Sequence, residues 1–80
     1  MRKNCSPDKI LKLVRQISGL RIDDPEADLL ACGLESIVLL EIIAIIENEY
    51  DLELNLDKLE SKSFIINATN LFTCMEFKFD

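Results

Sequence analysis

The chain has 80 residues and a formal net charge of −6, with fifteen acidic side chains against nine Lys and Arg. This excess of acid disfavours a nucleic-acid partner, which needs clustered basic side chains, and favours basic protein partners. A hydrophobic content of 49% indicates one folded domain over residues 1–80, and the complete absence of histidine excludes a Ser-His-Asp triad, a His-based zinc helix and an imidazole general base.

The first predicted helix covers about residues 7–18. Ser6 is a favoured N-cap residue, Pro7 suits the first helical position and Asp8 suits the first turn. Apolar residues recur behind them at helical spacing, and Gly19 is typical of the position after a helix end. We expect one face of this helix to pack on a core; the alternative is a helix that lies on a membrane surface.

Residues 20–35 form a long connection. Asp23, Asp24 and Pro25 are typical of a turn, and the apolar residues farther along are expected to hold the connection on the core. Asp28 is placed to cap a short turn. Ordered connections of this length are uncommon unless they have a function.

The longest apolar run follows Gly33 and predicts a central helix over about residues 36–50. Gly33 permits a backbone turn that other residues resist. Ser36 is a favoured N-cap residue, so we expect the helix to begin there with the hydroxyl exposed. The unpaired N–H groups and the positive end of the helix dipole favour any anion attached to that hydroxyl.

The central helix divides into two faces at about 100° per residue. One face is apolar and is expected to lie in the core. The other mixes apolar and acidic side chains, whereas a purely structural helix carries mostly polar groups there. We therefore predict a partner-binding surface on it; the alternative is a buried helix with a few solvated carboxylates. The core face comprises Val38, Leu39, Ile42, Ile43, Ile46 and Tyr50, and the predicted partner-binding residues are Glu35, Ile37, Leu40, Glu41, Ala44 and Glu47.

Residues 51–56 alternate polar and apolar side chains, which by itself suggests a strand. We expect an extended loop instead, because the sequence offers no second strand, and a lone strand leaves its backbone groups without partners. A short third helix is predicted at about residues 57–60.

The C-terminal part predicts a last helix over about residues 67–77, with Asn67 as its N-cap and Ser63 as a rival cap. Its inward residues would be Ala68, Leu71, Phe72 and Met75. The apolar segment before this helix is expected to be buried; it comprises Phe64, Ile65 and Ile66.

Cys5, Cys32 and Cys74 are widely spaced and form no CxxC pair, which argues against a disulfide framework and a thiolate metal site. We expect free thiols in a reducing compartment and no bound metal. The apolar run before and within the central helix contains Glu35 and Glu41, and carboxylates are costly inside a bilayer, so we expect no stable membrane insertion. No secretory signal opens the chain, and a cytoplasmic monomer is expected.

The segment Gly33-Leu34-Glu35-Ser36-Ile37, preceded by Asp28-Leu29-Leu30, resembles the phosphopantetheine attachment region of acyl and peptidyl carrier proteins. In that family the modified serine stands at the start of the second of four helices. Three residues precede it in a fixed order: Gly, then Leu or Ile, then Asp. Here Glu35 stands where Asp is the rule. Length, acidity and helix pattern extend the resemblance over nearly all of the chain, and residues 59–64 followed by Asn67 resemble the discrete, free-standing carriers.

The resemblance implies an all-α fold, the four-helix bundle of acyl carrier proteins with three main helices and one short helix. It implies that Ser36 carries 4′-phosphopantetheine covalently and that the arm holds an acyl, aminoacyl or polyketide intermediate as a thioester, for fatty acid, polyketide or nonribosomal peptide biosynthesis. The implied partners are a phosphopantetheinyl transferase, an acyl- or aminoacyl-loading ligase or transferase, and synthase or tailoring enzymes. The chain itself would not be an enzyme.

Two other functions remain open from the sequence. The chain could be an unmodified helical adaptor that binds a partner through Ile37, Leu40 and Ala44, with Ser36 serving only as an N-cap. It could also bind an apolar ligand inside the bundle.

Overall fold

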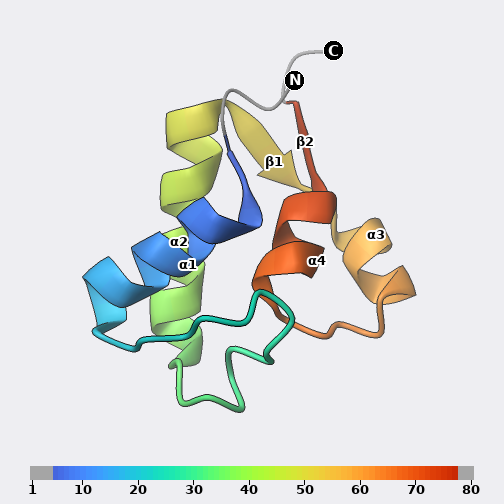
Figure 1. Ribbon diagram of the computed structural model, residues 1–80. Helices are drawn as coiled ribbons and strands as arrows, with labels where there is room; N and C mark the ends of the chain where they lie inside the picture. The colour runs from blue at the N-terminus through green and yellow to red at the C-terminus, as the bar shows by residue number, and fades with distance from the viewer. Residues whose placement is uncertain (1–4, 78–80) are drawn as a thin grey trace.

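The computed structural model describes residues 5–77, which form four helices and two short strands (Figure 1). α1 packs against α2 and α4, and the buried apolar side chains of these three helices form most of the core. The fold is therefore the expected small helical one, with a minor two-stranded sheet added. In chain order the elements are α1 (Pro7–Ser18), α2 (Ser36–Tyr50), β1 (Leu52–Leu54), α3 (Leu56–Ser61), α4 (Ala68–Thr73) and β2 (Met75–Phe77).

Local signals set both ends of α1. The Ser6 hydroxyl accepts a hydrogen bond from the backbone N–H of Lys9 at 3.3 Å, and Pro7 occupies the first helical position. Gly19 ends the helix at φ 79°, a left-handed conformation in which glycine is not strained. The buried face of α1 comprises Ile10, Leu11 and Val14.

The connection between α1 and α2 is fixed by contacts with the segment around the start of α4. The backbone N–H of Leu29 donates to the carbonyl of Ile66 at 2.8 Å, and that of Thr69 donates to the carbonyl of Pro25 at 3.1 Å. Leu29 and Leu34 are both buried. In Figure 1 the connection accordingly crosses toward α4 before it returns to the first turn of α2.

The strand prediction at residues 51–56 was wrongly rejected, because β1 pairs with β2 in an antiparallel sheet in which Leu54 lies opposite Met75. The predicted helix over residues 67–77 was correspondingly too long, since α4 ends at Thr73 and β2 follows. The residues of β2 lay within the range predicted to be helical. Met75 is buried as expected, but from a strand.

The segment after α3 also differs from its prediction, because Phe64 and Ile65 are exposed rather than buried. Asn55 caps α3 by accepting from the backbone N–H of Lys58 at 3.1 Å, and Leu59 supplies the buried contact of this helix. The chain then turns through two left-handed residues, Ser63 (φ 58°) and Phe64 (φ 52°). Apolar composition predicted burial, but in such a turn the backbone conformation decides where the side chain lies.

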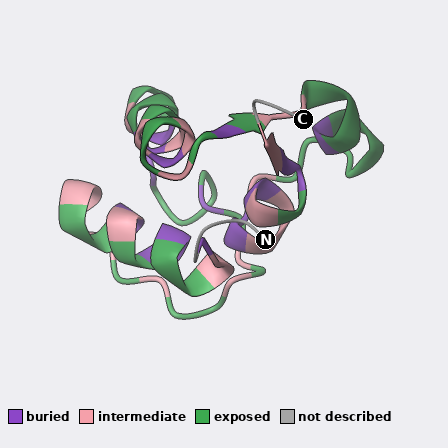
Figure 2. Cartoon of the chain, turned by 90° about the horizontal axis from the view of Figure 1, so that it is seen from above, coloured by how far each residue is buried: buried purple, intermediate pink, exposed green. Residues whose placement is uncertain are grey.

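Figure 2 shows that α2 and α3 lie along one side of the molecule and α1 along the opposite side, with α4 between them. The buried surface of each helix faces inward. On α2 it comprises Leu39, Ile42 and Ile46, all members of the predicted core face.

Candidate functional site

Ser36 is the exposed first residue of α2. It is not the N-cap that we predicted: Glu35 holds that position, and its carbonyl accepts the first helical hydrogen bond, from the backbone N–H of Leu39 at 3.0 Å. The Glu35 side chain makes no capping hydrogen bond. Among the residues that the structure describes, none forms a hydrogen bond with the Ser36 hydroxyl, so this hydroxyl is available for reaction.

A tight turn over residues 28–34 leads the chain into the start of α2, where Ser36 lies. Asp28 caps the turn, because its Oδ1 accepts from the backbone N–H of Leu30 at 3.1 Å and of Ala31 at 3.2 Å. Gly33 then takes a φ of 106°, which side-chain-bearing residues rarely adopt. Leu34 is buried directly afterwards, so α2 starts from an anchored backbone.

The charges around Ser36 are all acidic. Residues 22–57 contain no Lys and no Arg. The first turn of α2 carries no acidic side chain, and Glu35 at the N-cap is the acidic residue next to the positive end of this 15-residue helix dipole. The helix N-terminus favours a negative charge attached to Ser36, and the chain has no histidine that could activate the hydroxyl as an imidazole base.

The predicted partner-binding residues have unequal exposure. Ile37 and Leu40 are 67% and 64% exposed, which is high for large apolar side chains in a helix. Glu35, Glu41 and Ala44 are exposed as well. Glu47 is half-buried, and its carboxylate accepts from the backbone N–H of Leu54 at 2.9 Å. The Glu47 side chain therefore also provides a hydrogen-bond acceptor for a backbone N–H of β1. We call Ile37, Leu40 and Ala44 the α2 patch.

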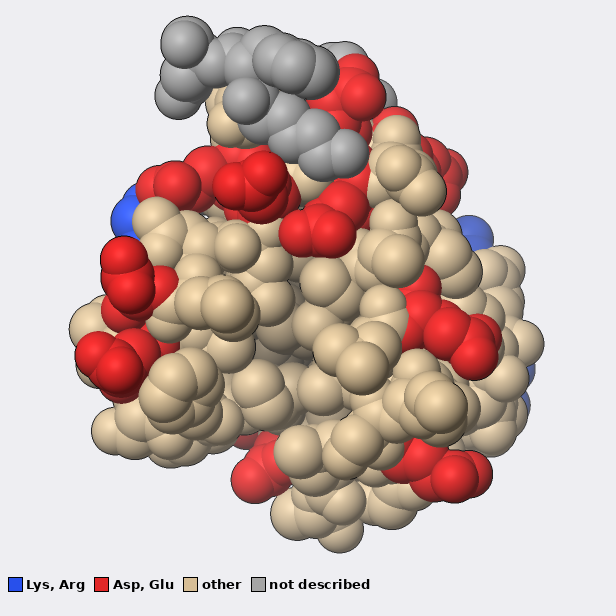
Figure 3. Space-filling view, turned by 180° about the vertical axis from the view of Figure 1, so that it is seen from behind, with Lys and Arg blue, Asp and Glu red and all other residues tan. Residues whose placement is uncertain are grey.

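A second exposed apolar group was missed by the sequence analysis. It belongs to α3 and the turn after it, and we call it the α3 patch: Leu56, Phe64 and Ile65, which are 63%, 53% and 47% exposed. α2 and α3 both border the face seen in Figure 3, which is largely uncharged, carries acidic side chains around and within it, and shows Lys and Arg only at its margins. No sequence signal marks these residues, because the apolar side chains of a turn resemble core residues.

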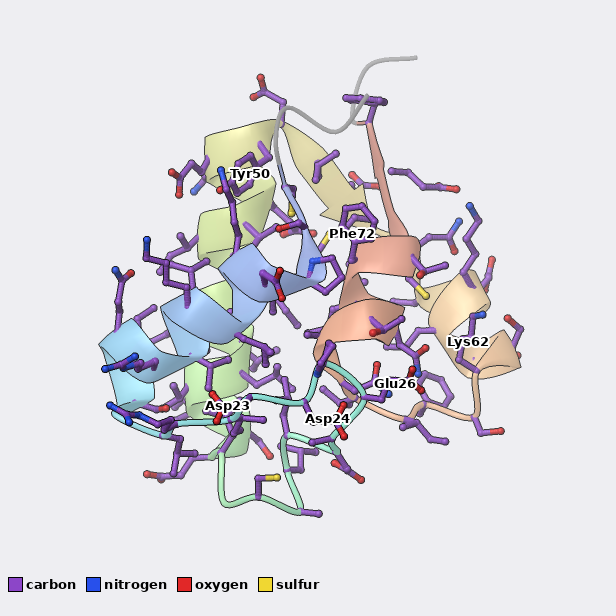
Figure 4. The ribbon with its side chains drawn as sticks, viewed as in Figure 1. Asp23, Asp24, Glu26, Tyr50, Lys62 and Phe72 are labelled. Atoms are coloured by element: carbon purple, nitrogen blue, oxygen red, sulfur yellow. The ribbon has the colours of Figure 1, made fainter. Side chains whose placement is uncertain are left out.

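The opposite end of α2 holds Tyr50, whose pKa departs from its ordinary value. Burial raises the pKa of Tyr50 above 10.0, and the negative charges of Glu49 and Cys5 act in the same direction. Figure 4 shows Tyr50 at the far end of α2 from the corner where the helix begins. This titration is therefore separate from Ser36.

Residues 5–77 contain neither a metal-binding cluster nor a membrane-spanning helix. No group of three or more Cys, Asp and Glu side chains there could hold a metal ion. None of the described helices is long and apolar enough to cross a membrane. No disulfide joins the described cysteines, of which Cys5 and Cys74 are buried and Cys32 is exposed.

A family model for a phosphopantetheine attachment site matches residues 8–64, which is more than half of the 80 residues and includes Ser36. Neither the search of curated proteins nor the search of solved structures found a significant match.

Proposed function

The chain belongs to the phosphopantetheine attachment family, and we propose that Ser36 is the serine to which its 4′-phosphopantetheine is attached. Members of this family are carriers and do not catalyse a reaction themselves. The observation that supports the assignment is the position of Ser36: it lies within the matched residues, is exposed at the start of α2, and has a hydroxyl without an internal hydrogen bond.

The chain's own residues hold and present this position. When bound, the arm supplies a terminal thiol that holds a cargo as a thioester. The unpaired N–H groups at the start of α2 would favour the negative charge of a phosphate on Ser36, and the turn at Gly33 (φ 106°) precedes this helix start. The chain has no histidine to act as the usual general base, so we expect the modifying transferase to supply the group that deprotonates the Ser36 hydroxyl.

The α2 patch, with Glu35 and Glu41 beside it, is the proposed surface for partner enzymes, and the α3 patch extends it. Exposed apolar side chains beside acidic ones suit a partner whose apolar pocket is surrounded by Lys and Arg. Such a surface is small and partly electrostatic, so binding is fast and reversible. Fast release is required of a carrier that visits a transferase, a loading enzyme and a synthase in turn.

The proposed cargo is an acyl, aminoacyl or polyketide group. Tethering raises its effective concentration at each partner's active site, so that reaction with a bound partner proceeds as if it were intramolecular. This advantage is common to fatty acid, polyketide and nonribosomal peptide assembly, and the proposal covers all three pathways.

Intact-mass spectrometry after incubation with a broad-specificity phosphopantetheinyl transferase and coenzyme A tests the proposal. The wild-type chain should gain the mass of one arm, and Ser36→Ala should gain none. Ser61→Ala is the matched control, because Ser61 is also exposed but lies at the end of α3; it should be modified like the wild type.

The exposed Ile37 and Leu40 also fit an unmodified adaptor that binds a partner through the α2 patch. A wild-type chain that gains no mass, in reactions where a known carrier is modified completely, would refute the carrier proposal and leave the adaptor. The adaptor in turn requires that Leu40→Ser abolish partner binding in a chain with an unmodified Ser36.

A further inference from the structure

A hollow of about 320 Å³ lies between α1 and the start of the connection that follows it. Its basic side chains are Lys12, Arg15 and Arg21, all exposed. Lys12 and Arg15 are three residues apart and therefore share one face of α1. The left-handed turn at Gly19 reverses the chain and brings Arg21 back beside that face.

Within the described part of the chain, none of Lys12, Arg15 and Arg21 forms an ion pair, whereas Lys58 pairs with Glu76 at 2.6 Å. In a chain with a net charge of −6, acidic groups are in excess, so unpaired basic side chains gathered in one hollow are unexpected. Asp8 and Asp23 line the same hollow and reduce their attraction for an external carboxylate, but neither forms an ion pair with them within the described residues.

The basic hollow lies away from the proposed partner surface. α1 occupies the side opposite α2 and α3 (Figure 2), and Lys and Arg reach only the margins of the face seen in Figure 3. The basic hollow and the α2 patch therefore lie on different sides of the molecule, and a partner on one leaves the other free.

We propose that the basic hollow is a second docking site, which binds an acidic segment of a protein partner. Arg15 and Arg21 can each bind a carboxylate through two N–H groups, and Lys12 can bind a third as a point charge. Leu11 and Ile22 line the same hollow and offer contact to one apolar side chain between the acidic ones. The site would hold the carrier on one protein while the arm and the α2 patch serve another.

The other residues of the hollow decide between kinds of anionic partner. Asp8 and Asp23 also line it, and Figure 4 shows Asp23 on the connection beneath α1. Two carboxylates here, on a chain of net charge −6, repel a densely charged surface such as an anionic membrane or a nucleic acid. A peptide with separated acidic side chains can place each one on a basic group and avoid Asp8 and Asp23.

A titration of the ¹⁵N-labelled 80-residue chain with a short synthetic peptide of Glu and Leu, followed by amide chemical shifts at low salt, tests this site. The signals of residues 8–23 should shift and those of residues 36–48 should not. The same peptide with Gln in place of Glu should cause no shift. Arg21→Glu should weaken binding by roughly tenfold, because an exposed attraction becomes a repulsion.

Lys62→Glu is the matched control, since it makes the same change of charge at an exposed lysine that is also unpaired among the described residues but lies beyond α3 (Figure 4). It should leave peptide binding unchanged. Equal weakening by both substitutions, or no shift with the Glu peptide, would overturn the proposal. Larger shifts of residues 8–23 with inorganic phosphate or phosphatidylserine vesicles than with the peptide would also overturn it. Mass gain at Ser36 is independent of these outcomes, and Arg21→Glu should retain it.

Discussion

Leu29→Ala tests whether contacts with the core hold the turn that presents Ser36. Leu29 is fully buried, and its backbone N–H donates to the carbonyl of Ile66 at 2.8 Å. Its neighbour Leu30 is 41% exposed and provides a control of the same residue type one position away. If Leu29 anchors the turn to the core, Leu29→Ala should loosen the turn and Leu30→Ala should not.

The expected cost follows from burial. Removing a fully buried leucine side chain typically costs about 2–5 kcal/mol, whereas a change at a partly exposed position should cost less than about 1 kcal/mol. Domains of this size have a free energy of unfolding of about 5–15 kcal/mol. Leu29→Ala should therefore remain folded without denaturant but lose much of its free energy of unfolding. Urea denaturation followed by circular dichroism measures both values.

Amide hydrogen exchange locates the effect. The backbone N–H of Leu34 donates to the carbonyl of Leu29 at 3.0 Å, so its protection should fall in Leu29→Ala by more than the loss of global stability explains. It should be unchanged in Leu30→Ala. Equal losses of stability in the two variants, with Leu34 equally protected in both, would show that the core does not hold this turn.

Three further predictions follow from the geometry. Ser36→Ala should change the free energy of unfolding by less than about 0.5 kcal/mol in urea denaturation, because no side-chain hydrogen bond is lost; a larger loss would mean that the hydroxyl caps α2 after all. Glu41→Lys should slow association with the transferase in stopped-flow measurements and reduce the salt dependence of that rate, at unchanged stability. Glu47→Lys should in addition lower the free energy of unfolding by about 1 kcal/mol, because the backbone N–H of Leu54 loses its acceptor. Equal stabilities of the two variants would contradict this role of Glu47. Because burial raises the pKa of Tyr50 above 10.0, the folded state keeps a proton that the unfolded state releases, so stability should be unaffected below that pH and fall as pH rises through the folded pKa. Alkaline unfolding should lose this fall in Tyr50→Phe, and an identical pH profile would refute the assignment.

The acidic corner at Ser36 was predictable because its signals are local. Gly33 has the positive φ that its position suggested, and Asp28 caps the turn before it. The hydroxyl was expected to be exposed, and it is. The cap itself lies one residue earlier than predicted, at Glu35, because a helix start is fixed by backbone angles that several neighbouring residues can adopt.

The sequence by itself determined the start of α1 and the division of α2 into faces, since caps and helical periodicity depend on residues within about four positions of one another. Tertiary structure decided the rest. β1 was visible as an alternation of polar and apolar residues, but its partner β2 lies about twenty residues away, and no local pattern shows which distant segment a strand pairs with. The α3 patch is exposed because the chain reverses at Ser63 and Phe64, and Glu47 is half-buried because β1 folds back beside α2. Contacts between distant segments set these environments, and they arise only when the whole chain has packed.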